Sequence, residues 1–429
     1  MSIKSLIYKL GIAMRNPSLL DHYHFLKETE HYSREELKRL QFETGKEFLC
    51  FAGKYSPYWK EKFEREGFDP QKMTSWDDLK KLAPIAKNDL LTDGDKIKSV
   101  YPFQKLQYSE TSGTSGQVLF FPRNEEWDSF NRAGMFRGYS WYGIKPFERN
   151  GYLWGYNINP KARRKVQFLD WLQNRFRCFS YSEEDVMRFT EKLQSAEFLS
   201  GYSSMIYEIA RLVNEMGLNP KYHLKMIKGT SEKIYPSYQE EVKKAFGQKI
   251  ISEYGAGEAG LIAFECPEGG NMHINMEHVY VEVEDGEILV TNFLSRSYPI
   301  IRYKLGDAVT LADPDFVCPC GRKHQVVLDV LGRVGKNIYG KKSIYPSLTF
   351  YYLFKNIALE HGVFLNYQAI QKEKGAVVLN IEKEAPEFLP FIQREIVKYF
   401  KDDVVFSVHF GVKLHEKNGK LKDFISEIQ

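Results

Sequence analysis

The stretch YSETSGTSGQVLFFPR, from Tyr108 to Arg123, joins a run of hydroxyl and glycine residues to an apolar run. Six consecutive residues, Thr111 to Gly116, are only Thr, Ser or Gly. Such a segment packs poorly, and its glycines cost backbone entropy on folding. Two interpretations fit this pattern. The segment is either a turn that needs Gly and Ser, or a cradle whose backbone N–H groups and hydroxyls surround phosphate oxygens.

The composition indicates a large folded protein with more than one domain. The chain has 429 residues, of which 43% are hydrophobic and 15% aromatic. A chain of this length is too long for one ordinary hydrophobic core. The hydrophobic and aromatic fractions argue against disorder. The 60 basic and 56 acidic residues give a net charge of +4, so charge gives no reason to expect a nucleic-acid partner.

No apolar stretch is long enough to suggest a membrane span. The first residues, MSIKSLIYKLGIAMRNP, mix basic and apolar side chains. This pattern fits a helix on a membrane surface, but we interpret it as the first helix of a globular fold. Five cysteines in a chain of this length are not a disulfide framework, so we expect a cytoplasmic protein.

Periodicity along the chain predicts an α/β fold. Residues 34–66 read as helical with a break at Ser56-Pro57, and another helix is expected after Ser75. From 105 to 300, short apolar strands alternate with helical patterns, which indicates βαβ units and a partly parallel sheet. Residues 278–311 read instead as antiparallel strands, with a turn at Asp285-Gly286.

Three glycines within residues 331–340 mark a domain boundary. We therefore predict a large N-terminal domain over 1–332 and a small C-terminal α+β domain over 333–429. In the small domain we expect a hairpin, a helix, a strand and a last loop, HEKNGKLKD.

Three familiar motifs are absent or out of context. GAGEAG, Gly255 to Gly260, has the dinucleotide-binding spacing, but no helical period follows it. TSGTSG lacks the lysine of a Walker A loop. No G-x-S-x-G elbow supports a serine hydrolase.

Five stretches in order, TSGTSGQ, EYGAGE, IRYKLGD, LGRVGKNIYGKKSIYP and NGK, resemble the core motifs of the adenylate-forming (AMP-forming acyl-ligase) superfamily. The similarity extends over nearly the whole chain. It is greatest to phenylacetate–coenzyme A ligases and CapK-like capsule-biosynthesis proteins. The resemblance implies a large N-terminal domain of mixed sheets and helices that binds ATP and a carboxylate, plus a small mobile C-terminal domain.

The resemblance also implies roles for the nucleotide-site residues. The hydroxyl-rich loop would hold the β- and γ-phosphates through Thr111, Ser112, Gly113, Thr114, Ser115 and Gly116. Glu258 matches the glutamate associated with Mg²⁺, a hard cation that prefers carboxylate and phosphate oxygens. Tyr254 and Gly255 would lie beside the nucleotide, with Tyr254 near the adenine. Asp307 would accept hydrogen bonds from the ribose hydroxyls, although an Asp after Gly306 also fits a capped turn.

Further residues implied by the resemblance lie on either side of these motifs. The adenine pocket would be lined by Gly229, Thr230, Ser231 and Glu232. Arg333 matches the arginine at the inter-domain hinge. Lys420 matches the catalytic lysine, whose ammonium would stabilise charge as a carboxylate oxygen attacks the α-phosphorus. Two positions depart from the pattern: Gly257 stands where many relatives carry Thr, and Gly335 where relatives often carry Asp.

Four soft ligands form a metal candidate. They are Cys266, His273, Cys318 and Cys320. Their C-x6-H and C-x-C spacings are not those of common zinc fingers, but three thiols and an imidazole suit tetrahedral Zn²⁺. Some phenylacetate–coenzyme A ligase-like relatives carry such a set with zinc. The alternative is three unpaired buried cysteines. His324 is interpreted as a surface residue.

Three functions remain open. The first is an acyl–coenzyme A ligase that uses ATP, Mg²⁺ and a small carboxylate. The second keeps the adenylation and transfers the acyl group to an amine, a hydroxyl or a carrier-protein thiol. The third is a degenerate nucleotide-binding module. The sequence does not specify the acid, the acceptor or the oligomeric state.

Overall fold

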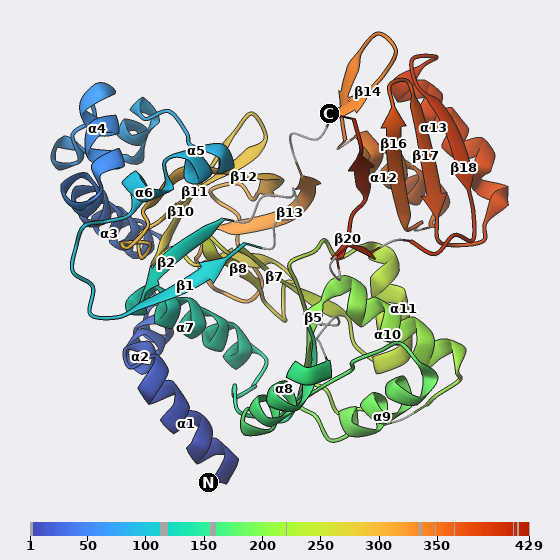
Figure 1. Ribbon diagram of the computed structural model, residues 1–429, viewed down its shortest axis with the longest axis horizontal. Helices are drawn as coiled ribbons and strands as arrows, with labels where there is room; N and C mark the ends of the chain where they lie inside the picture. Colours follow the sequence, from blue (N-terminus) through green and yellow to red (C-terminus); the bar gives the residue numbers. More distant parts are fainter. Residues whose placement is uncertain are drawn as a thin grey trace. The chain divides into compact units, whose positions relative to one another are not determined.

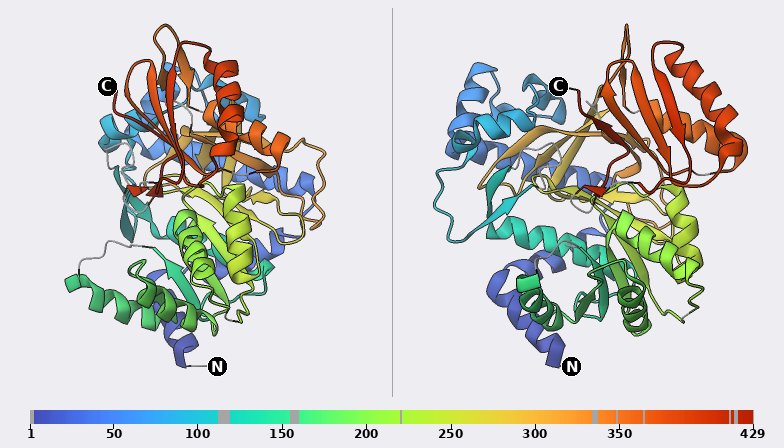
Figure 2. Two further views of the ribbon diagram at one scale, coloured as in Figure 1. Left: turned by 90° about the vertical axis from the view of Figure 1, so that its right-hand side faces the viewer. Right: turned by 45° about the vertical axis from the view of Figure 1, so that its right-hand side comes forward.

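The computed structural model describes residues 3–111, 119–154, 160–219, 221–333, 337–347, 349–363, 365–414, 416–417 and 420–428. Two compact units share the chain. The first comprises Met1–Glu148 and Ser252–Asp329, and the second comprises Arg149–Ile251 and Val330–Gln429. Figures 1 and 2 colour both units along the sequence, from blue to red. No helix within the described ranges is both long and apolar enough to cross a membrane.

Helices form the N-terminal part of the first unit. α3 begins after Ser33, which forms a capping box with Glu36, and Ser56 and Pro57 end α3 and begin α4. The predicted break at this point is confirmed. The helices are α1 (Ile3–Arg15), α2 (Leu19–Thr29), α3 (Arg34–Tyr55), α4 (Pro57–Arg65), η1 (Pro70–Lys72), η2 (Trp76–Lys81), α5 (Lys87–Thr92), α6 (Gly94–Ile97) and α7 (Glu125–Trp141).

An antiparallel sheet forms the rest of the first unit. Its strand order is β10-β11-β12-β13-β9-β8-β7, and the hairpin β1–β2 stands apart from it. The turn at Asp285-Gly286 has φ of 52° and 79°, as a two-residue hairpin requires. The strands are β1 (Leu106–Glu110), β2 (Phe120–Asn124), β7 (Ile250–Ala256), β8 (Gly260–Glu265), β9 (Met272–Ile274), β10 (Val279–Glu284), β11 (Glu287–Asn292), β12 (Ile300–Leu311) and β13 (Val326–Arg333).

Parallel strands alternate with helices in the first segment of the second unit. The order β6-β5-β3-β4 is parallel throughout, so the predicted βαβ units are confirmed. Side chains from Leu153 to Ile250 form its core. The elements are β3 (Asn150–Leu153), α8 (Pro160–Leu172), β4 (Arg175–Arg177), α9 (Glu183–Leu193), β5 (Phe198–Tyr202), α10 (Ser203–Glu215), β6 (Met226–Thr230) and α11 (Pro236–Phe246).

The second segment of this unit has its own sheet, β18-β17-β16-β21, with α12 and α13 packed against it (Figures 1 and 2). The expected hairpin, helix and strand are present, whereas part of the expected last loop forms the short hairpin β19–β20. The boundary at 332/333 stays a prediction. The elements are β14 (Asn337–Tyr339), β15 (Ile344–Pro346), α12 (Thr349–His361), β16 (Tyr367–Glu373), β17 (Ala376–Ile381), η3 (Pro386–Phe388), α13 (Leu389–Phe400), β18 (Val405–His409), β19 (Glu416–Lys417), β20 (Lys420–Leu421) and β21 (Phe424–Ser426).

Candidate active site and metal centre

The GAGEAG stretch forms the tight turn of the β7–β8 hairpin. Ala256 pairs with Gly260, and Gly255 pairs with Leu261. A Cβ atom at Gly255 would lie 2.4 Å from the Gly260 carbonyl oxygen, so the close approach of two backbones requires glycine there. A strand rather than a helix follows the last glycine. The dinucleotide-binding interpretation is therefore excluded, as the sequence context indicated.

Glu258 lies in this turn with a buried carboxylate. Its Oε1 accepts a hydrogen bond of 2.8 Å from the hydroxyl of Tyr303, which is also buried. Backbone hydrogen bonds between Ile85 and the residues on either side of Tyr303 fix that part of β12. The second oxygen, Oε2, has no hydrogen-bond partner among the described residues. A carboxylate oxygen without a hydrogen-bond partner is a ready ligand for a hard cation.

Tyr254 and Asp307 meet although they come from separate motifs. The Tyr254 hydroxyl donates a 3.0 Å hydrogen bond to Oδ2 of Asp307. Tyr254 lies on β7 and is buried, and Asp307 lies on β12 and is half-buried. The structure thus brings together the two residues that the resemblance places beside the nucleoside.

Thr111 lies at the start of the hydroxyl-rich loop and closes it. Its backbone N–H donates to the Leu119 carbonyl at 3.0 Å, and its hydroxyl accepts from the Leu119 N–H at 3.1 Å. Its Cγ2 would lie 3.7 Å from a Cβ atom placed on Gly257, so the loop begins beside the Glu258 turn. The other predicted phosphate ligands, Ser112, Gly113, Thr114, Ser115 and Gly116, lie outside the described residues.

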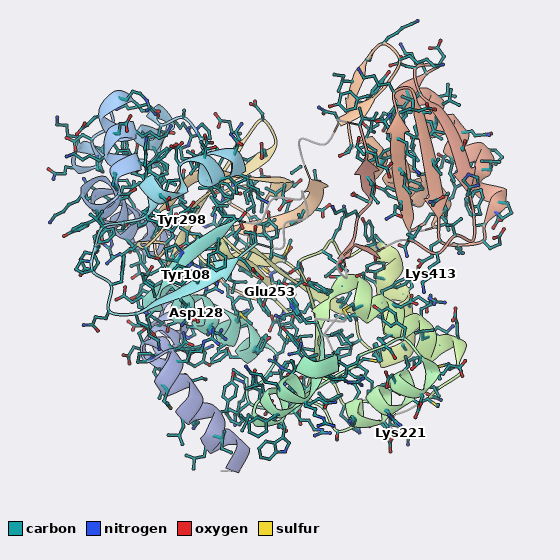
Figure 3. All side chains as sticks on the ribbon, viewed as in Figure 1. Tyr108, Asp128, Lys221, Glu253, Tyr298 and Lys413 are labelled. Atoms are coloured by element: carbon teal, nitrogen blue, oxygen red, sulfur yellow. The ribbon has the colours of Figure 1, made fainter. Side chains whose placement is uncertain are left out.

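Arg123, the last residue of the opening stretch, is a member of this site that sequence reasoning missed. Its guanidinium donates to the Gly257 carbonyl oxygen, and one of its nitrogens lies 3.9 Å from Asp128, which Figure 3 labels. It also lies over the ring of Trp127, at 5.1 Å. Burial lowers the pKa of Arg123, while Asp128 and Glu258 act against that shift. The only sequence signal for Arg123 was a cationic residue near the end of an apolar strand.

The remaining predicted residues belong to the second unit. Gly229 and Thr230 end β6, and Ser231 follows with a left-handed φ of 65°. The Glu232 carboxylate accepts a 2.8 Å hydrogen bond from the backbone N–H of Ser204, in the first turn of α10. Arg333 ends β13, and Lys420 pairs with Lys417 across the β19–β20 hairpin. The side chains of Arg333 and Lys420 lie outside the described residues.

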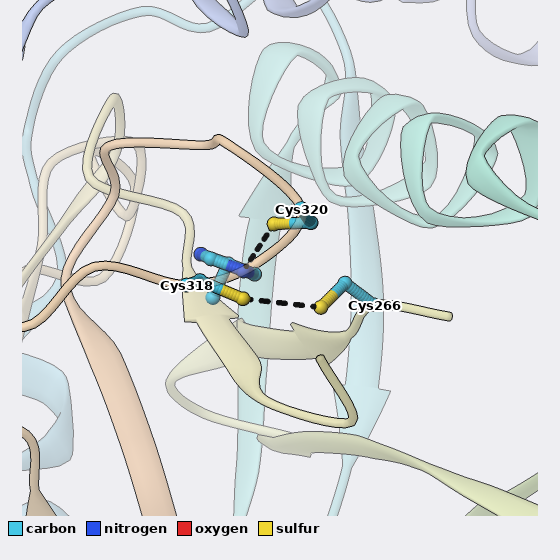
Figure 4. Close-up of side chains that lie close together, drawn as sticks. Cys266, Cys318 and Cys320 are labelled. Carbon is cyan, nitrogen blue, oxygen red and sulfur yellow. Dashed lines mark hydrogen bonds between the residues drawn. The ribbon is translucent and has the colours of Figure 1, made fainter. Parts of the chain in front are cut away.

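Cys266, His273, Cys318 and Cys320 converge in the first unit (Figure 4). Their ligand atoms all lie within 4.8 Å of one another. Cys266 follows β8, His273 lies on β9, and the other two lie between β12 and β13. The Cys266 and Cys318 sulfurs are 3.6 Å apart, and the Cys320 sulfur is 3.1 Å from Nε2 of His273.

The distance between the Cys266 and Cys318 sulfurs is close to the edge of a tetrahedral zinc site. Zn–S bonds of about 2.3 Å give an S–S edge of about 3.8 Å in a tetrahedron. The observed 3.6 Å is near that edge and far longer than a disulfide bond. Burial lowers the pKa of His273 to about 3, so its imidazole is neutral at neutral pH. The donor set therefore has the chemistry and the spacing of a closed zinc site.

A buried charge network lies beside this cluster and corrects one expectation. His324, interpreted as a surface residue, is buried, and its Nε2 lies 2.9 Å from Oε1 of Glu277. That oxygen also accepts from Thr29 at 2.6 Å and from Arg137 at 2.5 Å. Burial acts to raise the pKa of Glu277, but Arg137 and His324 outweigh it and hold that pKa well below its usual value. The partners of Glu277 come from segments that are distant in the sequence. Local sequence patterns therefore could not reveal that His324 is buried.

Comparison with known proteins gives sequence relatives of low identity. No protein-family model matches the chain. The chain is 25% identical over 311 residues to protein CapK of Staphylococcus aureus, which covers 67% of this chain and 68% of CapK. It is 25% identical over 118 residues to the indoleacetate–lysine synthetase of Pseudomonas savastanoi, which covers 27% of this chain and 29% of that protein.

Solved structures share the fold over almost the full chain. 2-Hydroxyisobutyryl-CoA ligase in the postadenylation state, in complex with R3-HIB-AMP, superposes with a TM-score of 0.72 at 15% identity and covers 94% of this chain and 92% of that one. An open conformation of the same ligase, with 2-HIB-AMP and CoA, gives a TM-score of 0.64 at 16% identity and covers 92% and 93%. The predicted α/β fold of an adenylate-forming ligase is confirmed.

Proposed function

We propose that this protein activates a carboxylic acid with ATP and then transfers the acyl group to coenzyme A. A carboxylate oxygen of the acid attacks the α-phosphorus of ATP, which forms the acyl-adenylate and releases pyrophosphate. The sulfur of coenzyme A then attacks the acyl carbon, and AMP leaves. Both steps balance without an oxidant or a reductant.

One observation carries this proposal. Glu258 and Asp307 are each engaged by a tyrosine, Tyr303 and Tyr254, within a fold shared with a ligase solved with an acyl-AMP. The free oxygen of Glu258 suits Mg²⁺, which would neutralise charge on the phosphates of ATP. Asp307 is assigned to the ribose hydroxyls, because a carboxylate accepts two hydrogen bonds from a vicinal diol.

The remaining assignments come from the family resemblance. The hydroxyl-rich loop that Thr111 begins holds the terminal phosphates. The Gly229–Glu232 segment lines the adenine, Arg333 acts at the hinge, and Lys420 supplies the ammonium that stabilises the adenylation transition state. We propose that the small domain turns between the two steps, which removes Lys420 and admits the acceptor.

An amine acceptor is the second candidate. The similarity to an indoleacetate–lysine synthetase favours it, since that name describes transfer to an amino group. The two candidates share the adenylation step and differ only in the nucleophile.

Pyrophosphate release tests adenylation directly. Purified protein, ATP and Mg²⁺ are incubated with a broad panel of aliphatic, hydroxy and aromatic acids. We expect carboxylate-dependent release, which Asp307→Asn and Glu258→Gln reduce by at least about a hundredfold. Coenzyme A and lysine are then supplied in parallel, and the product identifies the acceptor. If no acid in the panel releases pyrophosphate, the ligase assignment is wrong.

Separate half-reactions test the role of Lys420. Lys420→Ala should slow formation of the acyl-adenylate by at least about a hundredfold. It should leave the transfer from a supplied acyl-adenylate within about threefold of wild type, and Lys422→Ala, two residues further on, should spare both steps. An equal loss in both steps for Lys420→Ala would contradict a two-pose mechanism.

We also propose that Cys266, His273, Cys318 and Cys320 hold a structural zinc ion. When bound, the ion cross-links the ends of β8, β9 and the β12–β13 connection, and four protein ligands leave no open position for substrate. Thiolate ligands need a reducing compartment, which supports a cytoplasmic location. Metal analysis should give about one zinc per chain. Cys318→Ser should lose it and Cys50→Ser should keep it, whereas metal-free wild type with an intact fold would refute the site.

A further inference from the structure

Helix α1 exposes an apolar stripe on the face opposite its docked side. Leu6, Leu10 and Met14 are spaced four residues apart and are 52%, 57% and 81% exposed. On the other side of the helix the Tyr8 ring lies 6.4 Å from that of Phe147. Lys105 also donates to the Met14 and Arg15 carbonyl oxygens, which fixes the end of α1. The stripe therefore faces away from the unit while the helix is held to it.

Helix α8 of the second unit has the same property. Phe168, Leu169 and Trp171 are 59%, 43% and 54% exposed, and the Phe168 and Trp171 rings lie 6.1 Å apart. At about 100° per residue, Phe168 lies on the helix surface between Arg164 and Lys165, which are also exposed. The opposite face carries Asp170, which is buried.

The exposed charges on these two helices share one sign. The sequence of α1 contains no acidic residue, and Lys9 is exposed beside its stripe. The acid of α8, Asp170, is neutralised by Arg177, which binds both of its carboxylate oxygens at 2.7 and 3.0 Å. Both exposed faces therefore combine large apolar side chains with exposed cations.

We propose that α1 and α8 bind the protein to the surface of an anionic lipid bilayer. Exposed Leu, Phe and Trp next to Lys and Arg is the composition of helices that lie in the headgroup region, with the apolar face buried and the cations beside lipid phosphates. A Trp ring is suited to that interface because one end is apolar and the other is a donor. Each helix by itself combines the two contributions on which interfacial binding depends, a buried apolar face and electrostatic attraction to anionic lipids.

A second copy of this chain fits these faces less well. In a twofold interface each helix face meets the same face of its partner, which would gather the cations of both copies in one interface with no anions to offset them. A bilayer that carries phosphatidylglycerol or phosphatidylserine instead supplies the complementary charge and covers the apolar stripe at the same time.

Vesicle flotation with the full-length protein tests the proposal. Vesicles of phosphatidylcholine alone are compared with an equal mixture of phosphatidylcholine and phosphatidylglycerol. We expect binding to the anionic vesicles that decreases as salt is added, and much weaker binding to the neutral ones. The double substitutions Phe168→Ser/Trp171→Ser and Leu10→Ser/Met14→Ser should each weaken binding by at least about tenfold. Arg164→Gln/Lys165→Gln should weaken it on anionic vesicles only.

A matched control tests whether vesicle binding depends on these two helix faces or on any exposed apolar side chain. Val317→Ser/Val405→Ser removes two other exposed apolar side chains, 66% and 56% exposed, and should bind vesicles as wild type does. Pyrophosphate release in solution should be unchanged in every variant. Wild type that fails to bind, or helix variants that bind normally, would overturn the proposal. It would also be overturned if Phe168→Ser/Trp171→Ser converted a dimer to a monomer without changing vesicle binding.

Discussion

At the scale of single residues, the carboxylate of Glu277 neutralises the buried guanidinium of Arg137 inside the first unit. Arg137 and Glu277 form an ion pair with side chains that are 2% and 0% exposed. Removing one member of such a pair leaves an uncompensated buried charge. We expect Glu277→Gln to lower the free energy of unfolding by about 3–5 kcal/mol, measured by urea denaturation at pH 7.5.

An exposed ion pair provides the comparison for that variant. Arg296 lies 2.7 Å from Glu47, whose side chain is 70% exposed. Glu47→Gln also deletes one carboxylate beside an arginine, but water screens that pair, so the loss should stay below about 1 kcal/mol. Equal losses in the two variants would show that burial of the Glu277 pair has no special energetic role.

The burial of His278, the next residue, makes the stability of the fold depend on pH. Burial lowers its pKa to about 4, against the attraction of Glu277. In the unfolded chain its pKa is about 6.5. Between these values the unfolded chain binds a proton that the folded protein does not, so stability decreases as pH falls from 6.5 to 4, by about 3 kcal/mol. Urea unfolding of His278→Gln should have a flatter pH profile, whereas the exposed His31→Gln should reproduce the wild-type profile.

At this scale, sequence motifs singled out side chains that lie together in the structure, and the roles assigned to these residues stay predictions. Tyr254, Asp307 and the four soft metal ligands were all singled out, and the structure brings them together as two groups. Sequence reasoning missed Arg123 and the burial of His324. Their contacts, Gly257 and Glu277, are made across sheets and loops, and no local pattern encodes such partners.

At the scale of elements, the β7–β8 hairpin carries two glycines with opposite requirements. A Cβ atom at Gly255 would collide with the Gly260 carbonyl oxygen, whereas one at Gly257 would make an ordinary contact with Thr111. We expect Gly255→Ala to destabilise the protein by at least about 2 kcal/mol and to abolish pyrophosphate release. Thermal unfolding and the pyrophosphate assay provide these measurements.

Gly257→Thr should instead be tolerated. It restores the hydroxyl that many relatives of the resembled family carry, and a new hydrogen bond to a charged phosphate oxygen contributes about 1.5–3 kcal/mol. We therefore expect kcat/KM for ATP to rise by at least about tenfold, with stability unchanged. A fall in kcat/KM for this variant would show that the turn is adapted to glycine.

Element boundaries were predictable where one residue fixes them. Pro57 cannot continue α3 but suits the first turn of α4, and Asp285-Gly286 sets a two-residue turn. The helix expected after Ser75 is only partly right: a 3₁₀ helix ends at Lys81, and α5 begins at Lys87. Pro84 separates them, because a proline disfavours the helical conformation at the residue before it.

At the scale of the whole molecule, the proposed zinc ion should affect stability and not catalysis. Its ligands join three segments of one unit, and when all four are engaged no position is open to substrate. We expect chelator-treated protein to unfold at a lower temperature, by at least about 5 °C. Pyrophosphate release per folded molecule should match that of the zinc-loaded protein at 20 °C, and readdition of zinc should restore the unfolding temperature. A loss of activity at 20 °C with the fold intact would assign the metal a catalytic role.

The composition of the two units was beyond prediction from the sequence. Hydrophobic periodicity identifies strands such as β3, β6 and β7, but it does not state which distant segments pack into one unit. The first unit joins Met1–Glu148 to Ser252–Asp329, a pairing that depends on contacts of long sequence separation.

That discontinuity has a consequence for how the protein is made. While a ribosome synthesises Arg149–Ile251, which takes about 5–20 s at 5–20 residues per second, the finished helices of Met1–Glu148 have no sheet to cover them. Their apolar faces are exposed for that interval, so the nascent chain should depend on chaperones until residue 329 has emerged.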